Sequence, residues 1–333
     1  MKLSICIVGC DPVAKTLISE ISNLKEHFLL YFVDTDVSKA KNYCEIYGGQ
    51  DYFHDYISAI KDPRIDALYV GDPENFTIEN IESAVANCKH MLVSRDIFRD
   101  KEKYRKLNDI SKITDVKIVI AESFRFLPAV DKCKQIISRG YIGSLRMIQI
   151  QIDRFEESTK SEKTECDGEL WSYGLHCIDI LLNIIGFPRT LYAVRLPQVI
   201  KTMESEDGIV MIFKFKEEIT GLVNSSRASL FNQDKHIVNI TGSEGCITFN
   251  INDDQLIVET RSTKRTVRLM SGGPDTARGV SLMVQSFREN ILNNDQSVMS
   301  CKESNKNYAV AMTAYASMES GKSLPVNPIT SEI

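Results

Sequence analysis

Short apolar runs alternate with amphipathic stretches over about the first 121 residues. Such runs, bounded by polar and turn-forming residues, are typical of buried strands that are joined by helices. The predicted strands are 3–8, 28–33, 66–70, 90–93 and 117–120, and predicted helices lie at 36–48, 76–87 and 100–113. This series predicts an α/β domain with a doubly wound parallel sheet.

The pattern changes after residue 122 to longer runs rich in Ile, Val, Phe and Thr. A helix at 129–139 precedes predicted strands at 145–155, 190–196, 209–215, 222–228, 236–241, 246–250 and 256–267. We expect an α+β domain with a large, mainly antiparallel open sheet. The helices expected to cover one face of this sheet are 170–185, 280–292 and 304–319. The charged segment 156–169 is predicted to be a mobile loop.

The length of 333 residues favours two domains with separate cores. We place a dinucleotide-binding type of domain at 1–122 and a second domain at 123–333. Ligands of parallel sheets bind at the carboxyl ends of the strands, so the segments that follow four strands of the first domain should converge. These predicted cofactor-binding positions are Gly9, Asp11, Pro12, Val13, Asp34, Thr35, Gly71, Asp72, Pro73, Ser94 and Arg95.

The loop after the first strand departs from the dinucleotide fingerprint. It reads Gly-Cys-Asp-Pro-Val-Ala at residues 9–14, so Asp11 stands where G-x-G-x-x-G/A has its second glycine. A helix start binds phosphate through free N–H groups and the helix dipole, and a carboxylate there competes with the phosphate. A purely local interpretation makes Asp11 the N-cap and Pro12 the first helical residue. Both interpretations predict that dinucleotide affinity is weakened or lost.

Asp34 ends the second predicted strand. An acid at this place accepts hydrogen bonds from the adenosine ribose hydroxyls, which favours NAD over NADP. The alternative is a strand-end aspartate that belongs to the turn and helix cap at Asp34–Asp36.

Composition narrows the classes of partner. Lys and Arg total 40 against 45 Asp and Glu, so the net charge is −5, and no basic run suggests nucleic-acid binding. No run of 18 apolar residues and no leader pattern is present, which predicts a cytoplasmic protein without a membrane partner. The nine cysteines are scattered and lack any C-x-x-C, which suits a reducing compartment and predicts no metal site.

Four short motifs follow one another in a characteristic order: KHMLV at 89–93, FRFLPA at 124–129, GYIG at 140–143 and HCID at 176–179. In this order the sequence resembles the glucose-fructose oxidoreductase and inositol dehydrogenase family, Gfo/Idh/MocA, over nearly its whole length. The resemblance implies a Rossmann domain that binds NAD or NADP at 1–122. It further implies a C-terminal substrate and oligomerisation domain at 123–333, whose open sheet carries substrate residues and often forms a homo-oligomer, a dimer or tetramer. It also implies hydride transfer to or from a small polar substrate such as a sugar, cyclitol or related polyol.

The family's chemical residues match only in part. His176 stands at the position of the catalytic histidine, whereas Ser172 replaces the aspartate four residues before it. Arg95 replaces the lysine of the usual Glu-Lys-Pro, keeping charge and donors but unable to release a proton near neutral pH. Thr77 replaces a histidine, and Asp72 enters the turn before it, which makes the expected pyrophosphate site more acidic.

The predicted catalytic positions are therefore His176, Arg95, Ser172 and Asp179. In an α-helix Ser172, His176 and Asp179 share one face at i, i+4 and i+7, and Asp179 can raise the pKa of His176. One hypothesis is an NAD(P)-dependent oxidoreductase in which His176 moves a proton and Arg95 holds the substrate. The alternative is a non-catalytic descendant, with weak or no NAD binding, that binds a small molecule or a protein partner.

Overall fold

The computed structural model describes residues 1–333 except 12–13, 156–167, 230–233, 270–274, 296–299 and 329–333. The chain divides into two compact units, residues 1–122 with 280–304 and residues 123–279 with 305–333. These units differ from the predicted domains 1–122 and 123–333 in one segment, because 280–304 groups with the first unit.

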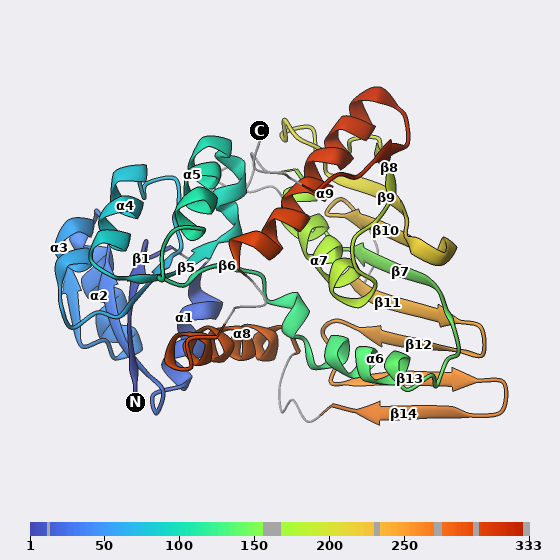
Figure 1. The fold of residues 1–333 in the computed structure, drawn as a ribbon, viewed down its shortest axis with the longest axis horizontal. Helices are drawn as coiled ribbons and strands as arrows, with labels where there is room; N and C mark the ends of the chain where they lie inside the picture. Colours follow the sequence, from blue (N-terminus) through green and yellow to red (C-terminus); the bar gives the residue numbers. More distant parts are fainter. Residues whose placement is uncertain (12–13, 156–167, 230–233, 270–274, 296–299, 329–333) are drawn as a thin grey trace. The chain divides into compact units, whose positions relative to one another are not determined.

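The first unit contains a parallel sheet with the strand order β3-β2-β1-β4-β5-β6 (Figure 1). Its strands are β1 (Leu3–Val8), β2 (Phe28–Val33), β3 (Asp51–Phe53), β4 (Ala67–Val70), β5 (His90–Ser94) and β6 (Ile118–Ala121). This order is that of the Rossmann fold, in which the strand order reverses at the switch point between β1 and β4. The predicted doubly wound sheet is confirmed, whereas the short β3 was not predicted.

Helices connect these strands, and side-chain caps explain where several of them begin. The connecting helices are α1 (Lys15–Asn23), α2 (Val37–Tyr47), α3 (Tyr56–Lys61), α4 (Ile78–Ala86) and α5 (Lys101–Ser111). Helix α8 (Asp275–Leu292) follows β14 in the chain and belongs to this unit from residue 280 onward. Asp36, Thr77 and Asp100 each accept a hydrogen bond from a backbone N–H in the first turn. The residue before α1, Ala14, has no side-chain cap, and its N–H donates to the carbonyl of Asp11 at 3.0 Å in a preceding 3₁₀ turn. Because residues 12–13 lie outside the described residues, the N-cap role of Asp11 stays a prediction.

The second unit contains a larger sheet with the order β14-β13-β12-β11-β7-β10-β9-β8-β15. The strands are β7 (Leu145–Asp153), β8 (Thr190–Arg195), β9 (Gly208–Lys214), β10 (Thr220–Ser226), β11 (Lys235–Gly242), β12 (Gly245–Asn250), β13 (Gln255–Thr260), β14 (Lys264–Arg268) and β15 (Leu324–Pro325). Only β7 and β10 pair in parallel among these strands, so the mainly antiparallel sheet is confirmed. The run 256–267, predicted as one strand, is the hairpin β13–β14.

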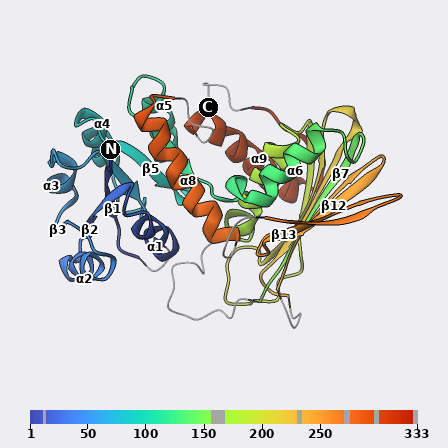
Figure 2. The same cartoon turned by 90° about the horizontal axis from the view of Figure 1, so that it is seen from below.

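Helices α6 (Pro128–Ser138), α7 (Leu175–Ile184) and α9 (Cys301–Ser320) belong to the second unit, α9 from residue 305 onward. Figure 2 shows α6 and α9 on the same face of the sheet. Ile148, Ile150 and Ile152 of β7 are fully buried, and their alternation marks one face as the core. The prediction that 280–292 also covers this sheet is wrong, because that part of α8 packs in the first unit.

Candidate active site

The loop after β1 and the loop after β4 lie against each other at the carboxyl edge of the first sheet. Gly9 has φ +87°, and a Cβ placed there would lie 2.8 Å from Cβ of Asp72. A Cβ on Gly71 would lie 2.9 Å from the Tyr69 ring and 3.4 Å from the carbonyl oxygen of Val8. Glycine is therefore required at both positions, since a side chain would separate the loops. Two of the predicted segments are thus brought together.

Asp34 fastens the first loop to the second strand. Its Oδ2 accepts from the backbone N–H of Cys10 at 2.8 Å, and its Oδ1 accepts from the N–H of Asp36 at 2.8 Å. Asp34 is 8% exposed. Asp34 therefore does bond within the turn at 34–36, as the alternative interpretation expected. Because each carboxylate oxygen has two lone pairs, this geometry also leaves acceptor capacity for a ribose hydroxyl.

Three carboxylates contribute negative potential at this edge. The pKa of Tyr56 is raised to about 12, mainly by burial and in addition by the negative charges of Asp34, Asp72 and Asp11. Burial and Asp34 likewise raise the pKa of Cys10 to about 12. Such a potential opposes a diphosphate, as the sequence indicated for Asp11 and Asp72. Pro12 and Val13, also predicted to bind the cofactor, lie outside the described residues.

The segment after β5 forms the short 3₁₀-helix η2 (Arg95–Arg99). Ser94 Oγ donates to Asp96 Oδ2 at 2.9 Å, and Arg99 Nη2 donates to Asp96 Oδ1 at 3.0 Å. Arg95 is half-buried, and its Nη1 has no hydrogen-bond partner among the described residues. The remaining predicted positions differ in exposure, since Thr35 is exposed and Pro73 is buried.

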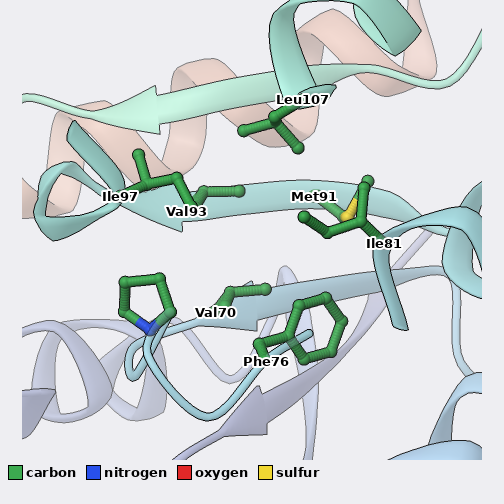
Figure 3. Close-up of a pocket in the computed structure, with 8 residues that line it drawn as sticks. Val70, Phe76, Ile81, Met91, Val93, Ile97 and Leu107 are labelled. Atoms are coloured by element: carbon green, nitrogen blue, oxygen red, sulfur yellow. The ribbon is translucent and has the colours of Figure 1, made fainter. Parts of the chain in front are cut away.

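A small pocket lies between β4, β5 and the helices beside them (Figure 3). Its lining is entirely apolar: Val70, Pro73, Phe76, Ile81, Met91, Val93, Ile97 and Leu107. No lining side chain is placed to bind phosphate or a ribose hydroxyl. We therefore assign this pocket to the core of the unit rather than to the candidate site.

In the second unit His176 is held between aromatic rings. The imidazole stacks on Phe124 with 3.9 Å between the ring centroids and 8° between the planes. Tyr173 presents an edge-to-face contact at 6.0 Å and 76°. Phe124 belongs to the 3₁₀-helix η3 (Phe124–Phe126), so two elements fix the plane of the imidazole.

Asp179 lies one turn further along α7 and binds Arg125, the residue after Phe124. Its fully buried carboxylate accepts from Arg125, with Nε 2.9 Å from Oδ2, and from Nδ2 of Asn307 at 2.8 Å. The geometry makes Asp179 the anchor that joins α7 to η3. An effect of Asp179 on the pKa of His176 stays a prediction.

Ser172 lies in a π-helical turn, η5 (Leu170–Gly174), that precedes α7. The N–H of Gly174 donates to the carbonyl of Glu169, which is an i→i+5 bond. Ser172 Oγ accepts from Arg154 Nη2 at 3.3 Å. The predicted i, i+4, i+7 spacing assumed a regular α-helix, so it does not describe Ser172.

Sequence reasoning missed a buried ionic cluster beside this turn. Glu169 is 0% exposed, and its carboxylate accepts from Arg154 at 2.7 and 3.0 Å, from Arg227 at 3.1 Å and from the Ser225 hydroxyl. The Arg154 guanidinium also lies 4.1 Å from the centroid of Tyr173. Glu169 ends the segment predicted to be a mobile loop, and its burial corrects that prediction at this residue, whereas 156–167 lie outside the described residues. The available signal was an arginine directly after each of two strands.

Among the described residues, no cluster of His, Cys, Asp and Glu side chains is placed to hold a metal ion. Within that same part of the chain, every helix is too short or too polar to cross a membrane.

Comparison with known proteins finds a family model that matches part of the chain and relatives that match most of it. Residues 130–248 match the GFO/IDH/MocA C-terminal domain. Trans-1,2-dihydrobenzene-1,2-diol dehydrogenase of Xenopus laevis is 22% identical over 271 residues, which cover 79% of this chain and 80% of that protein. The uncharacterized oxidoreductase YrbE of Bacillus subtilis is 22% identical over 245 residues, covering 72% and 71% of the two chains.

Solved structures share the fold over the whole chain. Levoglucosan dehydrogenase in complex with NADH and levoglucosan superimposes with a TM-score of 0.88 at 17% identity, covering 99% of this chain and 100% of the other. An oxidoreductase from Agrobacterium radiobacter in complex with NAD+, L-tartaric acid and magnesium gives a TM-score of 0.84 at 17% identity, covering 98% and 99%. The resemblance of this chain to the Gfo/Idh/MocA family is therefore confirmed.

Proposed function

We propose that this protein is an NAD(H)-dependent oxidoreductase that acts on a small polyhydroxylated substrate. The observation that carries the proposal is the Gly9 turn, held by Asp34 at the edge of a sheet with the nucleotide-binding strand order. The names and bound ligands of the relatives agree with redox chemistry on small hydroxylated molecules.

The residues at this edge fit the adenosine half of a dinucleotide better than its phosphates. Asp34 has acceptor capacity for the ribose, and the glycine turn leaves room for close approach of the backbone. Asp11 and Asp72 place negative charge where the diphosphate would lie, although Asp72 Oδ2 is bonded to Nδ2 of Asn75 at 2.5 Å. We therefore propose that NAD(H) binds more weakly than in the micromolar range.

Oxidation of an alcohol needs a hydride acceptor and a proton acceptor. A nicotinamide held at the edge of the first sheet would supply the hydride acceptor. We assign the second to His176, which takes the hydroxyl proton as the carbonyl forms. Its stacking on Phe124 orients the ring, and Asp179 with Arg125 positions the helix that carries it. We assign substrate binding to Arg95, because arginine keeps its proton near neutral pH. We assign to Ser172 a hydrogen bond to the substrate near His176.

Calorimetric titration of NADH into the purified protein tests the cofactor. We expect saturable binding of NADH at one site per chain, with an affinity weaker than micromolar. We also expect turnover of one or more sugars or cyclitols, and His176→Asn should abolish that turnover. Absence of any binding by the folded protein would refute the proposal.

A second candidate, a non-catalytic binding protein, is favoured by the carboxylates of Asp11 and Asp72. It predicts that a small polar ligand binds while NADH does not, and that His176→Asn leaves the affinity for that ligand unchanged.

We further propose that the protein forms a homo-oligomer through the face of the second sheet opposite α6 and α9. Ile212 on this face is 40% exposed, and its register partner Leu222 is half-buried. Apolar side chains that remain accessible on an open sheet favour a partner surface.

A further inference from the structure

Arg95 carries a charge that forms no ion pair with the described residues of the first unit. It follows β5 directly, at the carboxyl edge of the sheet, and opens η2. Its Nη1 is buried and has no hydrogen-bond partner in the described part of the chain. A buried N–H without an acceptor costs free energy, and a guanidinium has five N–H groups to satisfy.

The adjacent carboxylate is bonded elsewhere. Asp96 accepts from Arg99 Nη2 through Oδ1 and from Ser94 Oγ through Oδ2. These bonds close the short helix on itself. The acid that is nearest to Arg95 in sequence therefore serves the structure of η2, and the guanidinium stays available for another anion.

Tyr69 of the neighbouring strand β4 adds a second donor near Arg95. Its side chain is buried, with the residue 6% exposed, and its phenol lies within electrostatic reach of both Asp96 and Arg95. Burial raises the pKa of Tyr69, so the hydroxyl is neutral and can donate a hydrogen bond at neutral pH. A guanidinium and a neutral hydroxyl at the ends of adjacent strands suit an oxyanion.

We infer that the substrate carries a carboxylate, which accepts hydrogen bonds from the Arg95 guanidinium. The inference rests on the proposed function and narrows its substrate class from polyols to small hydroxy acids. A carboxylate matches the planar fork of arginine with two parallel hydrogen bonds and neutralises its charge, whereas a hydroxyl group does neither. In the reaction the carbinol carbon loses a hydride and its oxygen a proton, and the carboxylate is unchanged.

Matched pairs of acid and neutral polyol test this inference. D-gluconate is compared with D-glucitol, and L-tartrate with L-threitol, by calorimetry with and without NADH. We expect the acid of at least one pair to bind the wild type more tightly than its polyol. A charged hydrogen bond of this kind is worth about a tenfold to hundredfold change in Kd, so Arg95→Lys should weaken acid binding by that factor and Arg95→Met should abolish it. Arg105→Met, an exposed arginine of α5, is the matched control.

Two further measurements separate this role from others. Arg95→Met should raise the melting temperature of the ligand-free protein, because it removes a buried donor without a partner; a structural arginine would lower it. NADH affinity should stay the same in Arg95→Met, and its loss would show that Arg95 serves the cofactor and overturn the inference. The inference would also be overturned if acid and polyol bound with equal affinity, or if neither acid bound. If NADH fails to bind while the binding of gluconate or tartrate still depends on Arg95, the proposed function fails and the carboxylate site stands.

Discussion

At the residue scale, one buried carboxylate holds the first loop in place. Asp34 accepts from two backbone N–H groups, those of Cys10 and Asp36. The sequence could indicate an acid at the end of β2, because its position after an apolar run was clear. It could not indicate the bond to Cys10, which depends on the register of two parallel strands.

Replacement of Asp34 by asparagine should therefore destabilise the first unit. An amide presents one N–H₂ group toward a backbone donor, and losing an acceptor for a buried N–H costs about 1–3 kcal/mol. Urea unfolding of Asp34→Asn measures this cost, with the exposed Asp115→Asn as the control. Equal stability of the two variants would show that the Cys10 bond contributes little.

Replacement of Asp11 by asparagine removes a charge and keeps the side chain's size. Like charges a few ångströms apart near a surface repel by about 1–3 kcal/mol, so we expect NADH to bind about tenfold more tightly to Asp11→Asn. The gain should shrink as salt is added. An unchanged Kd at low salt would mean that Asp11 does not face the phosphates.

The stability of the protein should fall as the solution is acidified, in part because of His236. Burial lowers its pKa below the usual 6.5, with Arg154 acting in the same direction and Asp234, Asp153 and Glu169 opposing. The unfolded chain then binds the proton first, so the stabilisation is complete above about pH 6.5 and is lost as the pH falls through and below that value.

His236→Phe tests this dependence, because phenylalanine keeps a ring to stack on Tyr173 and cannot ionise. Its free energy of unfolding should vary less between about pH 7.5 and 5 than that of the wild type. The exposed His54→Gln is the comparison variant and should keep the wild-type slope. Identical slopes in all three proteins would exclude His236 as a source.

At the element scale, the start of α7 shows where sequence reasoning stopped. The helix over 170–185 was predicted from its apolar residues, and α7 confirms it. The turn before it is π-helical, and Glu169, the residue before that turn, is a fully buried acid bonded to two arginines that each follow a strand. Periodicity describes one segment at a time, so it cannot reveal an ionic cluster assembled from three. The hairpin β13–β14 was missed for a similar reason, since both of its strands are equally rich in β-forming residues.

Glu169 is the centre of that cluster, and its loss should be costly. Removing one member of a buried ion pair leaves a charge without compensation, at about 3–5 kcal/mol. Glu169→Gln should lower the free energy of unfolding by an amount in that range, measured by urea unfolding followed through Trp171 fluorescence. Glu204→Gln on the exposed surface is the control. A loss below about 1 kcal/mol would contradict the compensation that the contacts indicate.

At the scale of the whole molecule, the types of the two sheets follow from local patterns combined with general rules of topology, whereas their strand orders were not predicted. Alternating strands and helices predicted the parallel sheet, and successive β-rich runs predicted the open one. The return of 280–304 to the first unit was not predictable, because an amphipathic helix carries no sign of which sheet it covers.

The open face of the second sheet gives a prediction for assembly. Ile212→Asp places a charge among accessible apolar side chains, so we expect it to shift the protein toward the monomer. Light scattering after size-exclusion chromatography measures this shift. Ile46→Asp, at an exposed position of α2, should leave the mass unchanged. An identical mass for the wild type and Ile212→Asp would place the interface elsewhere or exclude an oligomer.

The proposed function depends most on binding of NAD(H) by the first unit, at an edge that Asp11 makes less favourable for the diphosphate. Calorimetric titration of NADH into the wild type and Asp11→Asn tests it directly. We predict weak saturable binding to the wild type, and binding about tenfold tighter to the variant. Micromolar affinity that is equal in both proteins, or no binding to either, would contradict the proposal.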